Sequence, residues 1–226
     1  MTKTSSSSPP FLLLGTLLVC LVSACQKPKG ETSITVEPPS VKIAKIKNVV
    51  AKNASIDPAE HEIAQTDWIF SIKPELDFSI KKEKQEHDGY HIWIEITAVK
   101  LKLALPIKTS VSDKAPKYVL DHENGHVEIC RRIYANAREH ALKAIASVSG
   151  KQFEGFGADR KLALANALQI AGQEIAAPYR TSTAGLAERV SSNYDQLCEK
   201  EERRNQVEKT VEDAFTAAQK ELKQKP

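Results

Sequence analysis

The sequence predicts an α+β fold, because strand patterns occupy its first half and helix patterns its second half. Residues 41–107 contain runs in which apolar and polar side chains alternate, whereas residues 116–226 read as helices separated by a glycine-rich loop. The chain has 226 residues, of which 41% are hydrophobic and 27% charged, as expected for one globular domain. We therefore expect a single domain over residues 41–226, with a β-rich part (41–107) before a helical part (116–226) that ends in a long helix.

The N-terminus reads as a targeting segment. Residues 11–22 form an apolar run that is too short to span a membrane comfortably. The run ends in Val22-Ser23-Ala24-Cys25, which resembles the lipobox of bacterial lipoproteins, whose cysteine receives a diacylglycerol. We predict a signal peptide over residues 1–24, lipidation of Cys25 and attachment to a membrane of the bacterial cell envelope, facing the periplasm or the surface. Gln26, where Asp often retains such proteins at the inner membrane, favours the outer membrane; a plain signal peptide is the alternative.

Residues 25–40 are polar, contain three prolines and show no helical period, so they are predicted to be a tether. A first strand is expected within residues 41–50, followed by a loop over residues 53–62. Two short strands are then expected at 68–72, before Pro74, and at 76–80.

Asp88-Gly89 is a turn signal, and the longest strand pattern of the chain follows it from Tyr90 to Leu105. The apolar residues of this strand change phase near Ala98, which predicts a bulge or bend, and Pro106 ends it. The two phases consist of Ile92, Ile94 and Ile96, and of Val99, Leu101, Leu103 and Leu105. These strands predict a small and largely antiparallel sheet.

Three helical stretches follow the sheet. The first runs from Tyr118 to Val148 with a break expected near Tyr134, and the second runs from Asp159 to Ile175, with Pro178 after its end. Gly150, Gly155 and Gly157 lie between the two and predict a loop. Residues 184–222 are highly charged and predict one long helix or two.

The first helix carries a metal-binding pattern, His122-Glu123-Asn124-Gly125-His126. Residues four apart lie on one face of a helix, so His122 and His126 can both bind one Zn²⁺. Glu123 can then reach a water on that metal and act as a general base, which is the core of many metallopeptidases. The alternative is a pair of histidines on an ordinary helix, and His61, His87, His91 and His140 are expected to be surface residues.

The cysteines suggest a covalent link between two of the predicted helices. Cys20 lies in the signal peptide and Cys25 is the lipidation site, which leaves Cys130 and Cys198. An exported compartment permits a Cys130–Cys198 disulfide, although two buried free thiols are the alternative.

The residues around this motif limit which families of metallopeptidases the chain can resemble. Metzincins are excluded, because Arg132 occupies the place of their third histidine. The sequence instead resembles the predicted secreted zinc-dependent proteases of the domain-of-unknown-function 922 family in its Trp93 strand, the run 101–106, the H-E-x-G-H core and the later Tyr194-Asp195 pair. That family follows the Tyr-Asp pair with a Thr-x-His-Gly element. Here Lys200 stands at the histidine position, and a protonated lysine cannot bind a metal.

A third metal ligand must therefore come from elsewhere in the chain. If the disulfide joins antiparallel helices, Glu202 lies opposite His126 and completes a His-His-Glu site. Asp195 takes this place if the helices run parallel. Glu201, Glu139 and the absence of any third ligand stay open.

Two functions follow. The first is a membrane-tethered zinc endopeptidase that cleaves peptide or protein substrates, binds them along an exposed sheet edge and uses Tyr194 to stabilise the oxyanion. The second is a non-catalytic envelope lipoprotein that keeps the fold as a binding module; a purely structural zinc is a third option. The net charge of +3 is spread among interleaved acidic and basic residues, which gives no reason to expect nucleic acid.

Overall fold

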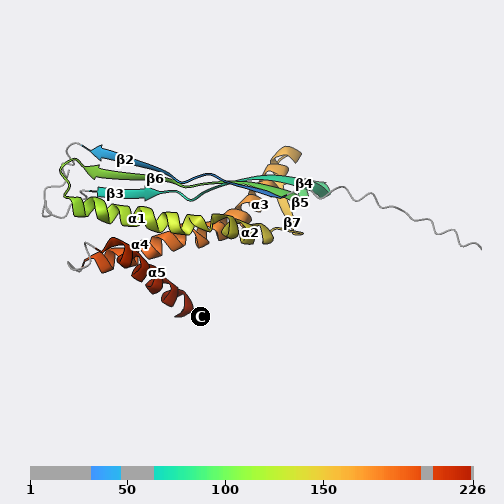
Figure 1. The fold of residues 1–226 in the computed structure, drawn as a ribbon. Coiled ribbons are helices and arrows are strands. Elements are labelled where there is room, and N and C mark those ends of the chain that lie inside the picture. Colours follow the sequence, from blue (N-terminus) through green and yellow to red (C-terminus); the bar gives the residue numbers. More distant parts are fainter. Residues whose placement is uncertain (1–31, 47–63, 200–205, 225–226) are drawn as a thin grey trace, which may run out of the picture.

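The computed structural model describes residues 32–46, 64–199 and 206–224, and these form one layer of strands with helices beneath it (Figure 1). The predicted signal peptide and Cys25 lie outside the described residues. The strands are β1 (Ser33–Val36), β2 (Ser40–Ile46), β3 (Ala64–Trp68), β4 (Ser71–Glu86), β5 (Gly89–Ala104), β6 (Pro106–Ser112) and β7 (Gln152–Gly157). The helices are α1 (Lys117–Ala135), α2 (Ala137–Ala146), α3 (Arg160–Ser182), α4 (Ala184–Cys198) and α5 (Val207–Gln224). The predicted α+β class is confirmed.

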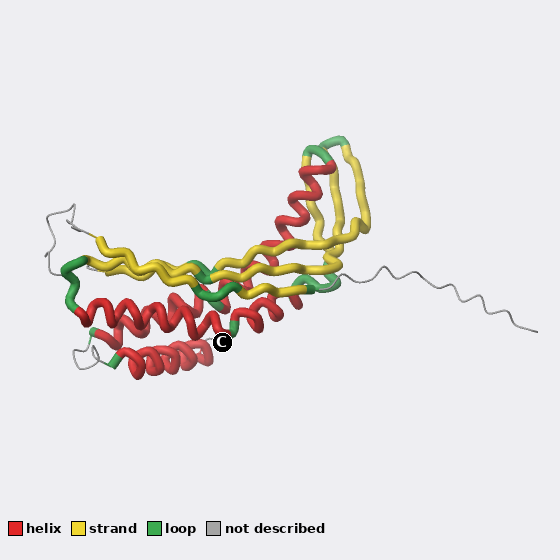
Figure 2. Tube along the Cα trace, turned by 45° about the horizontal axis from the view of Figure 1, so that its top comes forward, coloured by secondary structure: helices red, strands yellow, loops and turns green. Residues whose placement is uncertain are grey.

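The strands form two sheets that continue into each other. One sheet has the order β1-β5-β4, with β7 also paired to β5, and the other has the order β2-β6-β3. Only Leu105 separates β5 from β6, and backbone hydrogen bonds to Leu105 O (3.0 Å, from Ser40 N) and to Pro106 O (3.1 Å, from Ile69 N) bridge the junction. Figure 2 shows the result, a long strand layer that bends upward at the β4–β5 end, where the first part of α3 lies beside it.

The sheet is largely antiparallel, as predicted, with β1 and β2 as parallel exceptions. β5 pairs antiparallel with β4 and β7 and parallel with β1, and β6 pairs antiparallel with β3 and parallel with β2. The parallel strand β1 lies inside residues 25–40, so this part of the prediction of a tether is wrong. Ile34 explains why a strand forms where a tether was predicted. Its side chain is buried in the core, although prolines follow it closely.

β4 is one strand of 16 residues that covers the strand predicted at 76–80 and the end of the one predicted at 68–72, whereas Trp68 ends β3. β4 runs through Pro74, whose missing N–H is tolerated because β4 is an edge strand of its sheet. The charged run after Ile80 also pairs with β5, up to the pair Glu86–Gly89, so the turn predicted at Asp88-Gly89 is confirmed.

The predicted bulge in β5 is also confirmed. Asp77 pairs with Ala98 and Phe78 pairs with Ile96, which leaves Thr97 unpaired. The extra residue shifts the side-chain phase, so both apolar sets of β5 face the helices, and every member of both sets is at most 7% exposed.

β7 replaces the loop that its glycines predicted. A Cβ atom at Gly155 would lie 2.0 Å from Ala163 O, and one at Gly157 would lie 2.5 Å from Ala163 N. These glycines therefore allow the backbone of α3 to lie directly on β7, rather than marking a turn. β6 was missed as well, because Pro106 was predicted to end a strand, whereas it begins the central strand of the second sheet.

The helices agree more closely with the sequence. The break expected near Tyr134 occurs at Asn136, and residues 184–222 give two helices, α4 and α5. α3 continues through Pro178, where the prediction ended it; the Glu174 carbonyl that Pro178 cannot bond has Ser147 Oγ 3.1 Å away. None of the described helices is both long enough and apolar enough to cross a membrane.

Candidate metal centre

Three side chains from two helices converge on one point. His122 and His126 lie one turn apart on α1, and Asp195 comes from α4, which packs against it. His122 Nε2 lies 3.2 Å from His126 Nε2, and Asp195 Oδ1 lies 3.2 Å and 3.0 Å from these two nitrogens. The group can hold a metal ion.

The spacing of the three ligand atoms suits zinc. Ligand atoms about 2.05 Å from a tetrahedral zinc ion are about 3.3 Å apart, so the observed triangle needs to widen by only about 0.2 Å. The Asp195 side chain is 52% exposed, so the group is open to solvent on one side. Three protein ligands with one open position are the arrangement of catalytic rather than structural zinc sites.

The charges of the group favour its assembly. Hydrogen bonding to Asp195, with a further contribution from the neighbouring Cys198, raises the pKa of His122 to about 9. Burial alone would raise the pKa of Asp195, but hydrogen bonds from His122 and His126 outweigh it and lower that pKa to about 2. A metal ion must displace the proton that His122 shares with Asp195, so metal binding at neutral pH releases a proton.

Glu123 is held beside the metal ligands by a strand of the sheet. Its side chain is 6% exposed, and Thr66 Oγ1 on β3 donates a hydrogen bond of 2.6 Å to Glu123 Oε2. Thr109 Oγ1 on β6 lies 3.1 Å from the same hydroxyl. One carboxylate oxygen is thereby fixed, and the other is available to a substrate or a water.

The histidines are enclosed by aromatic rings. Trp68 on β3 stacks on His126 with ring centroids 6.2 Å apart, and Tyr194 stacks on His122 at 5.1 Å. His126 Nδ1 is buried without a hydrogen-bond partner among the described groups. Metal-binding histidines usually donate their second N–H to such a partner, so this nitrogen is a place for an ordered water.

Gly125 is explained by Tyr194. A Cβ atom at Gly125 would lie 2.2 Å from the Tyr194 hydroxyl oxygen, so only glycine leaves room for the phenol ring. The hydroxyl is fully buried without a partner, and burial raises the pKa of Tyr194 above its usual range. The buried hydroxyl lies against Gly125, which does not favour the predicted oxyanion role of Tyr194, and its ring packs on both imidazoles instead.

The predicted disulfide is wrong, because Cys130 and Cys198 are both free. Cys198 lines the same cavity as His122, and Cys130 lies eight residues after His122, about 12 Å further along the helix axis. Cys130 is instead a core residue, and burial raises the pKa of its thiol to about 12.

The third ligand therefore differs from the one inferred from the disulfide. α1 and α4 do run antiparallel, since Cys198 lies near His122 and Tyr194 lies near Gly125. Their register is shifted by two turns from that of a bridged pair, which brings Asp195 to the histidines. Glu202 and Glu201 lie outside the described residues. Glu139 belongs to α2 and forms an ion pair with Lys143 (2.7 Å).

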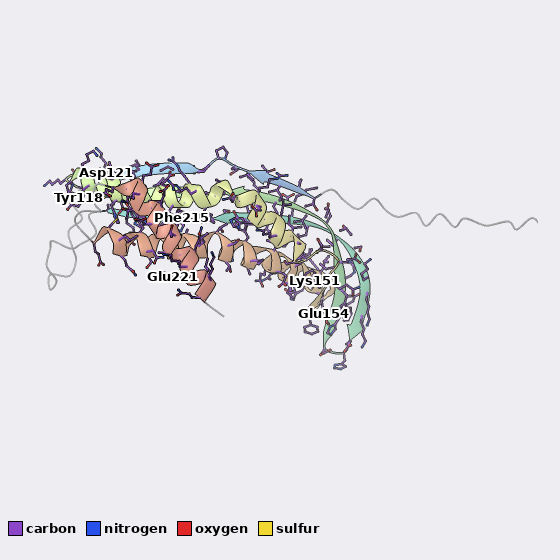
Figure 3. All side chains as sticks on the ribbon, turned by 60° about the horizontal axis from the view of Figure 1, so that its bottom comes forward. Tyr118, Asp121, Lys151, Glu154, Phe215 and Glu221 are labelled. Atoms are coloured by element: carbon purple, nitrogen blue, oxygen red, sulfur yellow. The ribbon has the colours of Figure 1, made fainter. Side chains whose placement is uncertain are left out.

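Two cavities meet at the metal ligands, and both share His122 and Asp195. A cavity of about 460 Å³ contains Glu123 and is walled by β3 and α4, and one of about 280 Å³ lies on the side of Tyr118 and Cys198. Figure 3 shows Tyr118 and Asp121 near the start of α1, at the end of the molecule far from Lys151 and Glu154.

The remaining histidines take no part in this centre. His91 forms a hydrogen bond with Glu154 (2.8 Å), His87 is exposed in the hairpin turn, burial lowers the pKa of His140, and His61 lies outside the described residues. Sequence reasoning missed Thr66 and Trp68, since neither stands near the motif in the chain. Only the alternation of Thr66 and Trp68 along one short strand hints at a shared face.

Comparison of the chain with protein-family models, curated proteins and solved structures finds no match. The resemblance to the domain-of-unknown-function 922 family stays a prediction that rests on the motif and the Tyr194-Asp195 pair.

Proposed function

We propose that the protein is a zinc-dependent endopeptidase, tethered to the bacterial cell envelope through a lipid on Cys25. The observation that carries the proposal is a buried carboxylate, Glu123, fixed by Thr66 beside three metal ligands in an open cavity. A structural zinc site has no need for a general base held in this way.

The residues divide the chemistry among them. A zinc ion held by His122, His126 and Asp195 supplies Lewis-acid chemistry, which acidifies water and polarises a carbonyl. Glu123 accepts a proton as the oxygen of a water molecule forms a bond to the peptide carbonyl carbon. Glu123 then returns the proton to the amide nitrogen as the C–N bond breaks, which leaves a carboxylic acid and an amine.

An extended peptide fits the sheet beside this site. β3 lies at the end of the order β2-β6-β3, so among the described residues it has β6 as its only strand partner. Its residues Thr66 and Trp68 line the cavity that contains Glu123. A substrate strand can therefore pair with the free edge of β3 and cross the metal ligands.

The test combines metal analysis with two matched substitutions. We expect about one zinc ion per chain, and Glu123→Gln should abolish peptide cleavage while metal content and unfolding midpoint stay unchanged. Glu128→Gln, on the same helix but paired with Arg132, is the control and should keep full activity. Protein that takes up no metal, or a Glu123→Gln variant that still cleaves, would exclude the peptidase.

A non-catalytic binding module is the second candidate. The observation in its favour is that both histidines reach Asp195 at hydrogen-bond distance, so the group is satisfied without an ion. This candidate predicts that prolonged chelation leaves the unfolding midpoint and partner binding unchanged.

A further inference from the structure

One face of α4 lines both cavities and passes through the metal centre. Its residues recur at intervals of three and four, which places them on one side of the helix. They are Glu188, Ser191, Ser192 and Asp195 in the larger cavity, and Asp195, Cys198 and Glu199 in the smaller one. From Glu188 to Glu199 the helix advances about 16 Å, which matches about five residues of an extended peptide.

The larger cavity is polar and has an acidic end. Glu188 lines it with an exposed side chain and, among the described residues, has no ion-pair or hydrogen-bond partner. By contrast, carboxylates such as Glu83 and Glu37 pair with a basic side chain. Ser191 Oγ on the same face is also without a partner, although Ser191 is only 4% exposed. No lysine or arginine of the described residues lines this cavity, so a basic group on a ligand would meet an unpaired carboxylate there.

The smaller cavity has a different character. Its lining includes Tyr118 and Val119 from α1, and Tyr194 and Cys198 from α4. Its volume of about 280 Å³ accommodates a leucine or phenylalanine side chain. Glu199 also lines it, but with an exposed side chain.

We propose that the substrate is an extended polypeptide with a basic side chain toward Glu188 and a bulky apolar side chain in the cavity lined by Val119 and Cys198. This inference rests on the proposed function, because it names the substrate class of the same site. Glu188 precedes Asp195 by seven residues, or about 10 Å, so the basic residue lies about three positions from the bond that is cut. The apolar residue lies on the other side of that bond.

Binding tests this inference without requiring cleavage. Zinc-loaded Glu123→Gln protein is titrated by calorimetry with four peptides, made in both chain directions. They carry Lys or Glu at the position expected to face Glu188, and Leu or Ser at the position expected to enter the cavity lined by Val119 and Cys198. We expect the Lys peptide to bind about tenfold tighter than the Glu peptide, and the Leu peptide about tenfold tighter than the Ser peptide.

Each preference has its own variant. Adding Glu188→Gln should remove most of the preference for Lys and keep that for Leu, whereas Val119→Thr, which keeps the side-chain shape, should weaken only the preference for Leu. Glu221→Gln, on the exposed side of α5 (Figure 3), is the control and should change neither. Absence of either preference, or a preference that its variant leaves intact, overturns the inference.

The same experiments distinguish a failure of the substrate inference from a failure of the proposed peptidase function. If Glu123→Gln protein shows both preferences but the unsubstituted protein cuts none of the peptides, the substrate inference stands and the peptidase fails. If the unsubstituted protein cuts peptides regardless of both side chains, the peptidase stands and the inference is overturned. Failure to bind any of the four peptides overturns it as well.

Discussion

The two ends of the molecule satisfy their polar side chains in different ways. At the hairpin end, where β4, β5 and β7 meet α3, Glu83 accepts hydrogen bonds from Arg160 and Tyr90, and His91 is hydrogen-bonded to Glu154. At the metal end, α1 and α4 carry five buried polar atoms that lack a partner among the described residues, whereas β4 carries one, Ser79 Oγ. The five are His126 Nδ1, Arg189 Nη1, Ser191 Oγ, Asn193 Nδ2 and Tyr194 Oη. Because an unpaired buried group costs stability, the comparison indicates a scaffold at one end and a binding site at the other.

The largest expected effect is on metal affinity, and it comes from comparing the replacement of one histidine at each end of the molecule by alanine. Loss of a residue that only supports a ligand reduces metal affinity about 10–100-fold, so His126→Ala, which removes a ligand, should reduce it further. His91→Ala should leave metal affinity unchanged, because His91 pairs with Glu154 at the other end. Zinc titration with a competing chelator measures both; equal losses would contradict the assignment.

The glycines give the next effect. Gly125→Ala should destabilise the protein by about 1–3 kcal/mol, because the new methyl group overlaps Tyr194. Gly155→Ala should be at least as costly, since it meets the backbone of α3. Tyr194→Ala should partly rescue Gly125→Ala, whereas no side-chain change can make room at Gly155. Urea unfolding of the single and double variants checks this, and additive losses at positions 125 and 194 would count against it.

An effect of similar size is expected from the loss of the hydrogen bond that holds Glu123. Thr66→Val removes a hydrogen bond to a buried carboxylate and should cost about 1.5–3 kcal/mol of stability. It should also slow cleavage while metal content stays the same. Thr35→Val, at an exposed position of β1, is the control strand substitution. If Thr66→Val lowered metal content instead, Thr66 would act on the ligands rather than on Glu123.

The smallest effect concerns the exposed network of the hairpin end. Hydrogen bonds from Arg160, and then from Tyr90, hold the pKa of Glu83 below its usual value of 4.5. A lowered carboxyl pKa stabilises the folded state above pH 4.5, and this contribution is lost as the pH falls through the lowered value. Glu83→Gln should therefore be slightly less stable than the unsubstituted protein at pH 7 and nearly equal to it near pH 3. A difference independent of pH would show that charge is not involved.

The sequence predicts best where one local pattern decides the structure. The phase change at Ala98 predicted the bulge, and the four-residue spacing of His122 and His126 placed both on one face. It predicts poorly where distant segments decide. The register of α4 against α1 is consistent with the packing of Tyr194 on Gly125, not with a disulfide, and this contact brings Asp195 to the metal centre. The glycines of β7 read as a loop because close helix packing and a turn both select glycine.

Because the strands follow one another almost without a break, the facing of side chains near Glu123 depends on the register of the β4–β5 hairpin at the other end. β3 leads into β4 through only two residues, Ile69 and Phe70, and β5 leads into β6 through one. A slip of one position in the pairing that begins at Glu86–Gly89 reverses the facing of every side chain in a strand. With so short a connection to absorb it, such a slip would turn Thr66 away from Glu123. The hairpin turn therefore helps to set the strand register on which the hydrogen bond between Thr66 and Glu123 depends, although the turn lies at the other end of the molecule.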